Sequence, residues 1–200
     1  DKLASLTFFD PACGCGNFLV ITYRELRALE LELLLELNPE GQRKLDAAAL
    51  SRIDVDQFYG IEISEFPARI AETALWMMDH LMNLRLSEAF GGYYPRIPLK
   101  KSPTILHGDA LEVDWATVLP PERCSYVLGN PPFIGKTYQT KEQRAAMAPI
   151  VADVKNGKLL DFVCGWFLKA AAYIDETTIG VGLVSTNSVV QGEQAAILWS

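Results

Sequence analysis

The segment LTFFDPACGCGN, residues 6–17, decides the fold class of this 200-residue chain. Its opening leucine, threonine and two phenylalanines are typical of a short strand. Gly14 and Gly16 then allow a tight turn, and apolar residues follow at helical spacing from Leu19 to Leu37. A strand, a glycine turn and a long helix in this order indicate the first unit of a parallel α/β sheet.

The rest of the chain repeats the alternation of strand and helix. After the strand at 6–9, we expect strands at 58–63, 104–107, 125–128 and 180–185. We expect helices at 19–37, 43–52, 65–86 and 159–174. The helix at 43–52 is interpreted as an insertion near residues 38–56, the segment 91–98 as a loop, and 136–157 as a polar stretch. This order predicts a Rossmann-like, doubly wound, mostly parallel sheet with the carboxyl ends of its strands along one edge.

The composition fits one globular domain, with 50% hydrophobic and 22% charged residues. A net charge of −7 argues against strong DNA binding by these residues alone, since phosphate contacts need clustered lysine and arginine. We find no signal peptide and no apolar run near the ~20 residues that span a membrane, so we expect a cytoplasmic protein without membrane partners. We predict no metal site, because none of the four cysteines forms a Cys-x-x-Cys pair.

Polar residues stand at the ends of four predicted strands: Asp10, Glu62, Asp109 and Asn130. Ligands of open α/β sheets bind outside the carboxyl ends of the strands. Three acids at this edge would repel a phosphate-rich cofactor and favour one with hydroxyls, an amino group and a positive charge. Glu62 is placed to accept hydrogen bonds from ribose hydroxyls, and Asp109 to accept from the exocyclic amine of an adenine ring.

Each of these features also has a plainer interpretation. The Gly-x-Gly turn can be a simple connection between strand and helix, because the third glycine of dinucleotide loops and the lysine of phosphate loops are missing. Glu62 can be a solvated acid at a strand end. Asp109 can cap a helix.

The sequence Asn130-Pro131-Pro132-Phe133 is the most specific feature of the chain. Two prolines after a buried strand remove two backbone donors and stiffen the loop. The amide oxygen of Asn130 and the carbonyl of Pro131 can then both accept from one amino group, while Phe133 stacks on the ring that carries it. A rigid but inert turn is the alternative.

Together these motifs resemble the S-adenosylmethionine-dependent DNA amino-methyltransferases, specifically those with an Asn-Pro-Pro-Phe/Tyr motif that modify adenine N6. The likeness extends to residues 160–162 and 184–188, and it is greatest to the methyltransferase part of large bacterial restriction-modification proteins of the type IIG or MmeI-like kind. The resemblance implies S-adenosyl-L-methionine as cofactor, bound by Asp10, Pro11, Ala12, Gly14, Gly16, Phe18, Glu62, Ile63, Asp109 and Ala110. It implies that the catalytic residues are Asn130, Pro131, Pro132 and Phe133.

The resemblance also assigns roles within the site. Asp10 and the two glycines would surround the amino-acid end of the cofactor, Glu62 would hold its ribose and Asp109 its adenine N6. The enzyme would be a site-specific, adenine-specific DNA-methyltransferase of a bacterial cytoplasm, acting on an adenine flipped out of the duplex. Cys15 departs from the small hydroxyl residue that the family often has between the glycines.

Rival functions remain open at this point. The same loop suits cytosine N4, an RNA amine or a protein glutamine, and a non-catalytic module that binds cofactor or a partner is a further alternative. We expect residues 1–200 to be one partial catalytic domain without a target-recognition domain, with weak DNA binding and self-association through an unfinished sheet edge. A basic run can follow a DNA backbone or lie in a solvated mobile loop: Lys136, Lys141, Arg144, Lys155 and Lys158.

Overall fold

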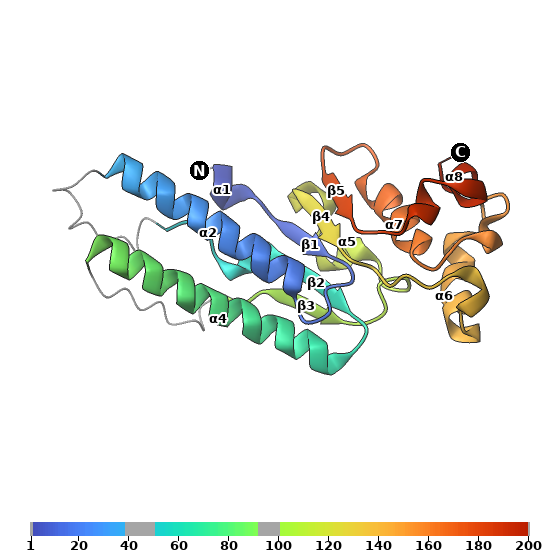
Figure 1. The fold of residues 1–200 in the computed structure, drawn as a ribbon, viewed down its shortest axis with the longest axis horizontal. Coiled ribbons are helices and arrows are strands. Elements are labelled where there is room, and N and C mark those ends of the chain that lie inside the picture. The colour runs from blue at the N-terminus through green and yellow to red at the C-terminus, as the bar shows by residue number, and fades with distance from the viewer. Residues whose placement is uncertain (1, 39–50, 92–100, 200) are drawn as a thin grey trace.

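The computed structural model describes residues 2–38, 51–91 and 101–199, and its centre is a five-stranded parallel sheet (Figure 1). The strands follow the order β3-β2-β1-β4-β5, and all four neighbouring pairs are parallel. Their bounds are β1 Phe8–Asp10, β2 Phe58–Glu62, β3 Thr104–His107, β4 Tyr126–Gly129 and β5 Gly180–Leu183. The chain winds outward from β1 to β3, then returns to place β4 on the other side of β1. The predicted doubly wound α/β sheet is therefore confirmed, with its switch point between β1 and β4.

Helices cover both faces of this sheet. The helices are α1 Lys2–Ser5, α2 Asn17–Leu37, α4 Glu65–Phe90, α5 Trp115–Val118, α6 Lys141–Ile150, α7 Cys164–Ile174 and α8 Gly192–Leu198. Helices α2 and α4 lie side by side on one face (Figure 1). The core on that face includes Phe8 and Phe58, whereas Phe9 packs with residues of α5 and α7 on the other face. Alternation along β1 thus divides the core into two layers.

The structure corrects the sequence analysis at several element boundaries. Helix α4 continues to Phe90, beyond the predicted end at 86, and α7 begins at Cys164, because residues 157–159 form a 3-10 turn. The short helix α5 separates β3 from β4 and was not predicted. The predicted helix at 43–52 falls mainly on residues 39–50, outside the described residues, and Ser51 and Arg52 are not helical. The predicted loop at 91–98 likewise lies outside them beyond Gly91, which is a turn residue.

The stretch 136–157 contains helix α6, so a wholly mobile loop is the wrong interpretation for this segment. A capping box joins Thr140 and Gln143 at the start of the helix. Each side chain accepts a hydrogen bond from the backbone N–H of the other residue, and these two N–H groups have no partner within the helix. Ala146 and Met147 anchor its inner face in the core. Within the described ranges, no helix combines the length and the apolar character needed to cross a bilayer.

A buried polar network joins α2 to α4. The Arg27 guanidinium donates from Nη1 to Asp79 Oδ1 at 3.0 Å and from Nη2 to Asn83 Oδ1 at 2.8 Å, and its Nε lies 3.2 Å from Glu30 Oε2. Glu30 in turn accepts from the backbone N–H of Ile53 at 3.1 Å. All four polar side chains are buried. The network therefore fixes the helix pair together with the segment that leads into β2.

We expect Arg27→Met to lower the free energy of unfolding by about 3–5 kcal/mol, because the change leaves buried carboxylates without their cation. Urea unfolding measures this loss. Arg24→Met is the matched control on the same helix, since Arg24 pairs with Glu25 in solvent, and its effect should stay within about 0.5 kcal/mol. Equal losses for the two variants would contradict a structural role for the buried network.

Candidate active site

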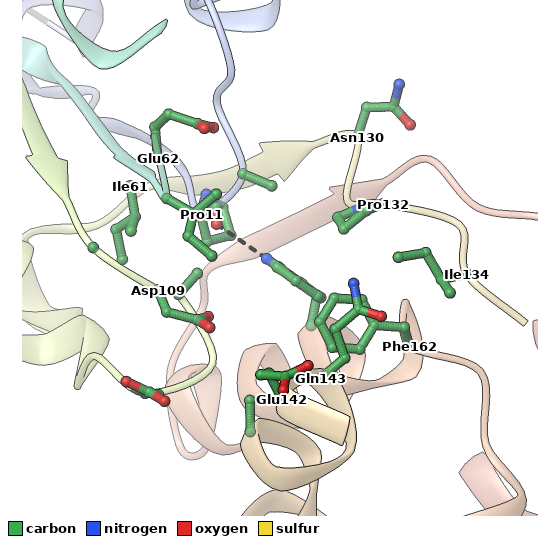
Figure 2. A pocket seen from close by; sticks show the side chains of 17 residues that line it. Pro11, Ile61, Glu62, Asp109, Asn130, Pro132, Ile134, Glu142, Gln143 and Phe162 are labelled. Carbon is green, nitrogen blue, oxygen red and sulfur yellow. Dashed lines mark hydrogen bonds between the residues drawn. The ribbon is translucent and has the colours of Figure 1, made fainter. Parts of the chain in front are cut away.

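A cavity of about 510 Å³ lies at the carboxyl edge of the sheet, and it receives residues from four strand ends (Figure 2). Eight of the sequence-predicted site residues line it: Pro11, Ala12, Glu62, Ile63, Asp109, Ala110, Asn130 and Pro132. The other six do not: Asp10, Gly14, Gly16, Phe18, Pro131 and Phe133. The structure thus brings six of the ten predicted cofactor residues and half of the Asn-Pro-Pro-Phe loop to one cavity.

The glycine turn after β1 is held by backbone hydrogen bonds to itself and to β2. The N–H of Cys13 donates to the Ile61 carbonyl at 3.1 Å, and the N–H of Gly16 donates to the Cys13 carbonyl at 2.8 Å. Gly16 has φ +84°, and a Cβ there would lie 2.9 Å from the Cβ of Ala71 on α4. Both the left-handed backbone and the close approach of α4 require glycine at this position.

Glu62 braces the glycine turn. Its Oε2 accepts from the N–H of Gly14 at 3.1 Å, and its Oε1 accepts from the N–H of Ser64 at 2.9 Å. Glu62 is therefore not the simple solvated acid that a strand end allows. Each carboxylate oxygen has two lone pairs, so Glu62 retains the capacity to accept from a ligand in the cavity.

Asp109 organises the turn after β3. Its Oδ1 accepts from the N–H of Leu111 at 2.8 Å, so Asp109 caps the turn that follows, in agreement with the capping alternative, although this segment is a turn and not a helix. Lys169 of α7 donates through Nζ to the Leu111 carbonyl at 3.2 Å and also to the Val113 carbonyl. Burial lowers the pKa of Lys169. The lysine fixes the turn from which Asp109 faces the cavity (Figure 2).

The Asn130–Phe133 loop follows β4 directly. Asn130 and Phe133 are exposed, whereas Pro131 is buried. The loop is tied down at both ends, because the N–H of Val184 donates to the Gly129 carbonyl at 2.9 Å and the N–H of Phe162 donates to the Ile134 carbonyl at 2.8 Å. The loop therefore presents the Asn130 side chain from a fixed backbone.

Asp10 is buried beside this loop. It is 1% exposed, and its Oδ1 accepts from the N–H of Ala12 at 2.9 Å. A Cβ at position 129 would lie 2.5 Å from the same Oδ1, so only glycine can stand at the end of β4. Burial, together with repulsion from Glu62, outweighs the Ala12 hydrogen bond and raises the pKa of Asp10 from an ordinary 3.8 to about 7.

The sequence analysis missed the wall of the cavity that lies across from the strand ends. Phe162 and Trp166 come from the beginning of α7 and its preceding turn, and Glu142 and Gln143 come from α6. Trp166 donates from Nε1 to the Pro11 carbonyl at 3.0 Å, the dashed line in Figure 2. The four-residue spacing of Phe162 and Trp166 was the one sequence signal for a shared face.

The comparisons with known proteins agree with this geometry. The family described as MmeI, DNA-methyltransferase domain, matches residues 1–200. This chain belongs to that family. It is 41% identical over 202 residues to DNA methyltransferase A of Bacillus subtilis (strain 168), with all of this chain and 23% of the relative covered.

One solved structure supports the same assignment, and a second supports the fold. The type IIL restriction-modification enzyme MmeI in complex with DNA superposes with a TM-score of 0.95 at 55% identity, over 99% of this chain and 27% of that one. The ATP-dependent type ISP enzyme LlaBIII bound to DNA reaches a TM-score of 0.57 over 96% of this chain and 14% of that one, and its 18% identity supports the fold alone. The chain spans about a quarter of the length of the first two relatives.

Asp10→Asn should make stability less dependent on pH. The raised pKa means that the Asp10 contribution is complete below about pH 4 and is lost as the pH rises to about 7. Asparagine keeps the acceptor for Ala12 but carries no charge. Relative to the wild type, the free energy of unfolding of Asp10→Asn should therefore rise between pH 4.5 and 8, as measured by urea unfolding.

The exposed Asp153 supplies the matched control for this experiment. Asp153→Asn should differ from the wild type by no more than about 0.5 kcal/mol at either pH. A difference between Asp10→Asn and the wild type that is the same at pH 4.5 and pH 8 would contradict the raised pKa.

Proposed function

We propose that this chain is a catalytic domain that transfers a methyl group from S-adenosyl-L-methionine to the N6 amino group of adenine in DNA, within a restriction-modification system. The observation that carries the proposal is the shared cavity: Glu62, Asp109 and Asn130, which stand at or just after the ends of three strands, all line it. Membership of the MmeI DNA-methyltransferase domain family supports DNA as the substrate. A bacterial, cytoplasmic location is part of the same proposal.

The chemistry of the cavity fits the cofactor. S-adenosylmethionine offers a cationic sulfonium, two ribose hydroxyls and an exocyclic amine, and each of these favours carboxylate neighbours. Glu62 and Asp109 supply acceptors, while Ile63, Ala110 and Pro132 supply apolar surface for a flat ring. We assign the ribose to Glu62 and the adenine amine to Asp109. The remaining predicted residues, from Asp10 to Phe18, shape the glycine turn for the amino-acid end.

The proposed mechanism rests on the Asn130–Phe133 loop. An aromatic amino nitrogen is a poor nucleophile, because its lone pair is delocalised into the ring. Asn130 Oδ1 and the Pro131 carbonyl accept from its two N–H groups, which favours a pyramidal nitrogen and directs the lone pair away from the ring. The bound cofactor supplies an electrophilic methyl group. The surplus proton leaves the nitrogen for solvent after transfer, so the loop needs no strong base.

The target base must leave the duplex to reach this loop, and the exposed ring of Phe133 offers a surface on which it can stack. The basic run continues along α6 and the turns after it, where Lys141, Arg144, Lys155 and Lys158 are exposed. We assign these side chains to the DNA backbone.

Calorimetric titration with S-adenosylmethionine tests the cofactor assignment. We expect Glu62→Ala and Asp109→Ala each to weaken binding about 10- to 100-fold, since each change removes a charged hydrogen-bond acceptor. Glu122→Ala is the control, because Glu122 is an exposed acid outside the cavity. Circular dichroism checks that Glu62→Ala, which also loses the brace to Gly14, retains its fold. Unchanged binding of S-adenosylmethionine by both cavity variants would contradict the assignment of the cofactor site.

Asn130→Ala tests the catalytic assignment in the complete protein that carries these residues. We expect kcat for adenine methylation to fall about 10²- to 10³-fold, because the nitrogen loses a partner needed mainly in the transition state. The dissociation constant for S-adenosylmethionine should change less than about threefold. Wild-type turnover by this variant would show that Asn130 has no part in the chemistry.

A further inference from the structure

Gln143 lines the cavity from the wall across from the strand ends, in a segment to which the sequence analysis gave no cofactor role. It is the third residue of α6 and is half-buried. Figure 2 shows its amide group extending into the cavity beside Phe162. The amide is therefore placed to contact a ligand bound in the cavity.

The orientation of the Gln143 amide is fixed by the capping box. The N–H of Thr140 donates to Gln143 Oε1 at 2.9 Å, and the N–H of Gln143 donates to Thr140 Oγ1 at 3.2 Å. Because Oε1 already accepts from the backbone, rotating the amide by half a turn would break the cap. The NH2 group is therefore the part that faces the cavity, as its nitrogen does in Figure 2.

The cavity has many acceptors and few donors among its lining side chains. Four of those side chains are carboxylates: Glu62, Asp109, Glu112 and Glu142. Three carry N–H groups, and one of these, Trp166, donates to the Pro11 carbonyl. Asn130 belongs to the catalytic loop. Gln143 is thus the remaining side chain of the lining that offers N–H groups to a bound cofactor.

We infer that the Gln143 side-chain NH2 donates a hydrogen bond to N7 of the cofactor adenine and so selects for that ring; this inference rests on the proposed function. Adenine carries its N6 amine between two acceptors, N1 and N7. The Asp109 carboxylate accepts from N6, and the N–H of the adjacent Ala110 has no partner among the described residues, which suits N1. N7 then faces the opposite wall, from which Gln143 extends.

Asp109 and Gln143, on opposite walls of the cavity, would together recognise the purine edge that carries N6 and N7. A ring with a carbonyl in place of the amine would set an acceptor against the Asp109 carboxylate. A ring without N7 would leave the Gln143 NH2 unpaired in a partly buried position. The Gln143 amide therefore has two uses, because its oxygen caps α6 and its NH2 group contacts the cofactor.

Gln143→Glu isolates the donor from the cap. Glutamate also satisfies a capping box, so the helix keeps its N-terminal hydrogen bonds while the NH2 donor is replaced by an acceptor. Ala145→Glu is the matched control, since it adds the same charge to an exposed residue of α6 that does not line the cavity. Thermal unfolding of both variants checks the fold.

The measurement is calorimetric binding of S-adenosylhomocysteine and of its 7-deaza analogue to the complete protein. We expect the wild type and Ala145→Glu to prefer S-adenosylhomocysteine about tenfold, the value of one hydrogen bond. Gln143→Glu should bind S-adenosylhomocysteine about tenfold more weakly and should lose the preference between the two ligands.

The outcomes separate the inference from the proposed function. If Gln143→Glu keeps the tenfold preference while Glu62→Ala and Asp109→Ala weaken binding, the Gln143 contact is overturned and the cofactor site stands. If the wild type does not distinguish the two ligands, N7 has no donor and the contact is again overturned. If neither ligand binds the wild type, the proposed function fails, and the inference fails with it.

Discussion

The close contact between the Asp10 carboxylate and Gly129 is the constraint on which the site depends. The carboxylate occupies the space that a side chain at 129 would need, so the ends of β1 and β4 meet directly at the switch point of the sheet. The glycine turn leaves one of these strands and the Asn130–Phe133 loop leaves the other. Their separation is therefore set by the pairing of β1 with β4.

That contact buries a carboxyl group close to the cavity in which we propose that a cationic cofactor binds. Burial and the neighbouring Glu62 both disfavour ionisation of Asp10 and raise its pKa to about 7. A positively charged ligand close to the turn would reverse this balance, because an opposite charge stabilises the carboxylate. The position of Asp10 is therefore consistent with the proposed cofactor, which carries a positive charge, and less so with a nucleotide phosphate.

The elements that could be predicted are those whose signal lies within a short stretch of sequence. The run from strand to glycine turn in residues 6–17 and the periodic spacing in 65–86 both reflect contacts within one element and its core face. Helix α6 escaped prediction because its stability comes from a single cap and two buried residues, within a stretch that is otherwise polar. The contribution of Trp166 could not be read from the sequence either, since it depends on a hydrogen bond to Pro11, 155 residues away.

The same distinction explains why the acceptors were found and the donor was missed. An acid at the end of a strand is informative by position alone, because the topology of the sheet sends every strand end to one edge. A glutamine in the first turn of a helix has an ordinary structural use, and the capping box at Thr140 supplies it. The capping box uses the oxygen of the Gln143 amide, and the cavity shows that its NH2 group is available to a ligand. A residue that serves the fold and the site at once therefore resembles a structural residue in sequence, and its second role becomes visible when its unused hydrogen-bonding groups are counted.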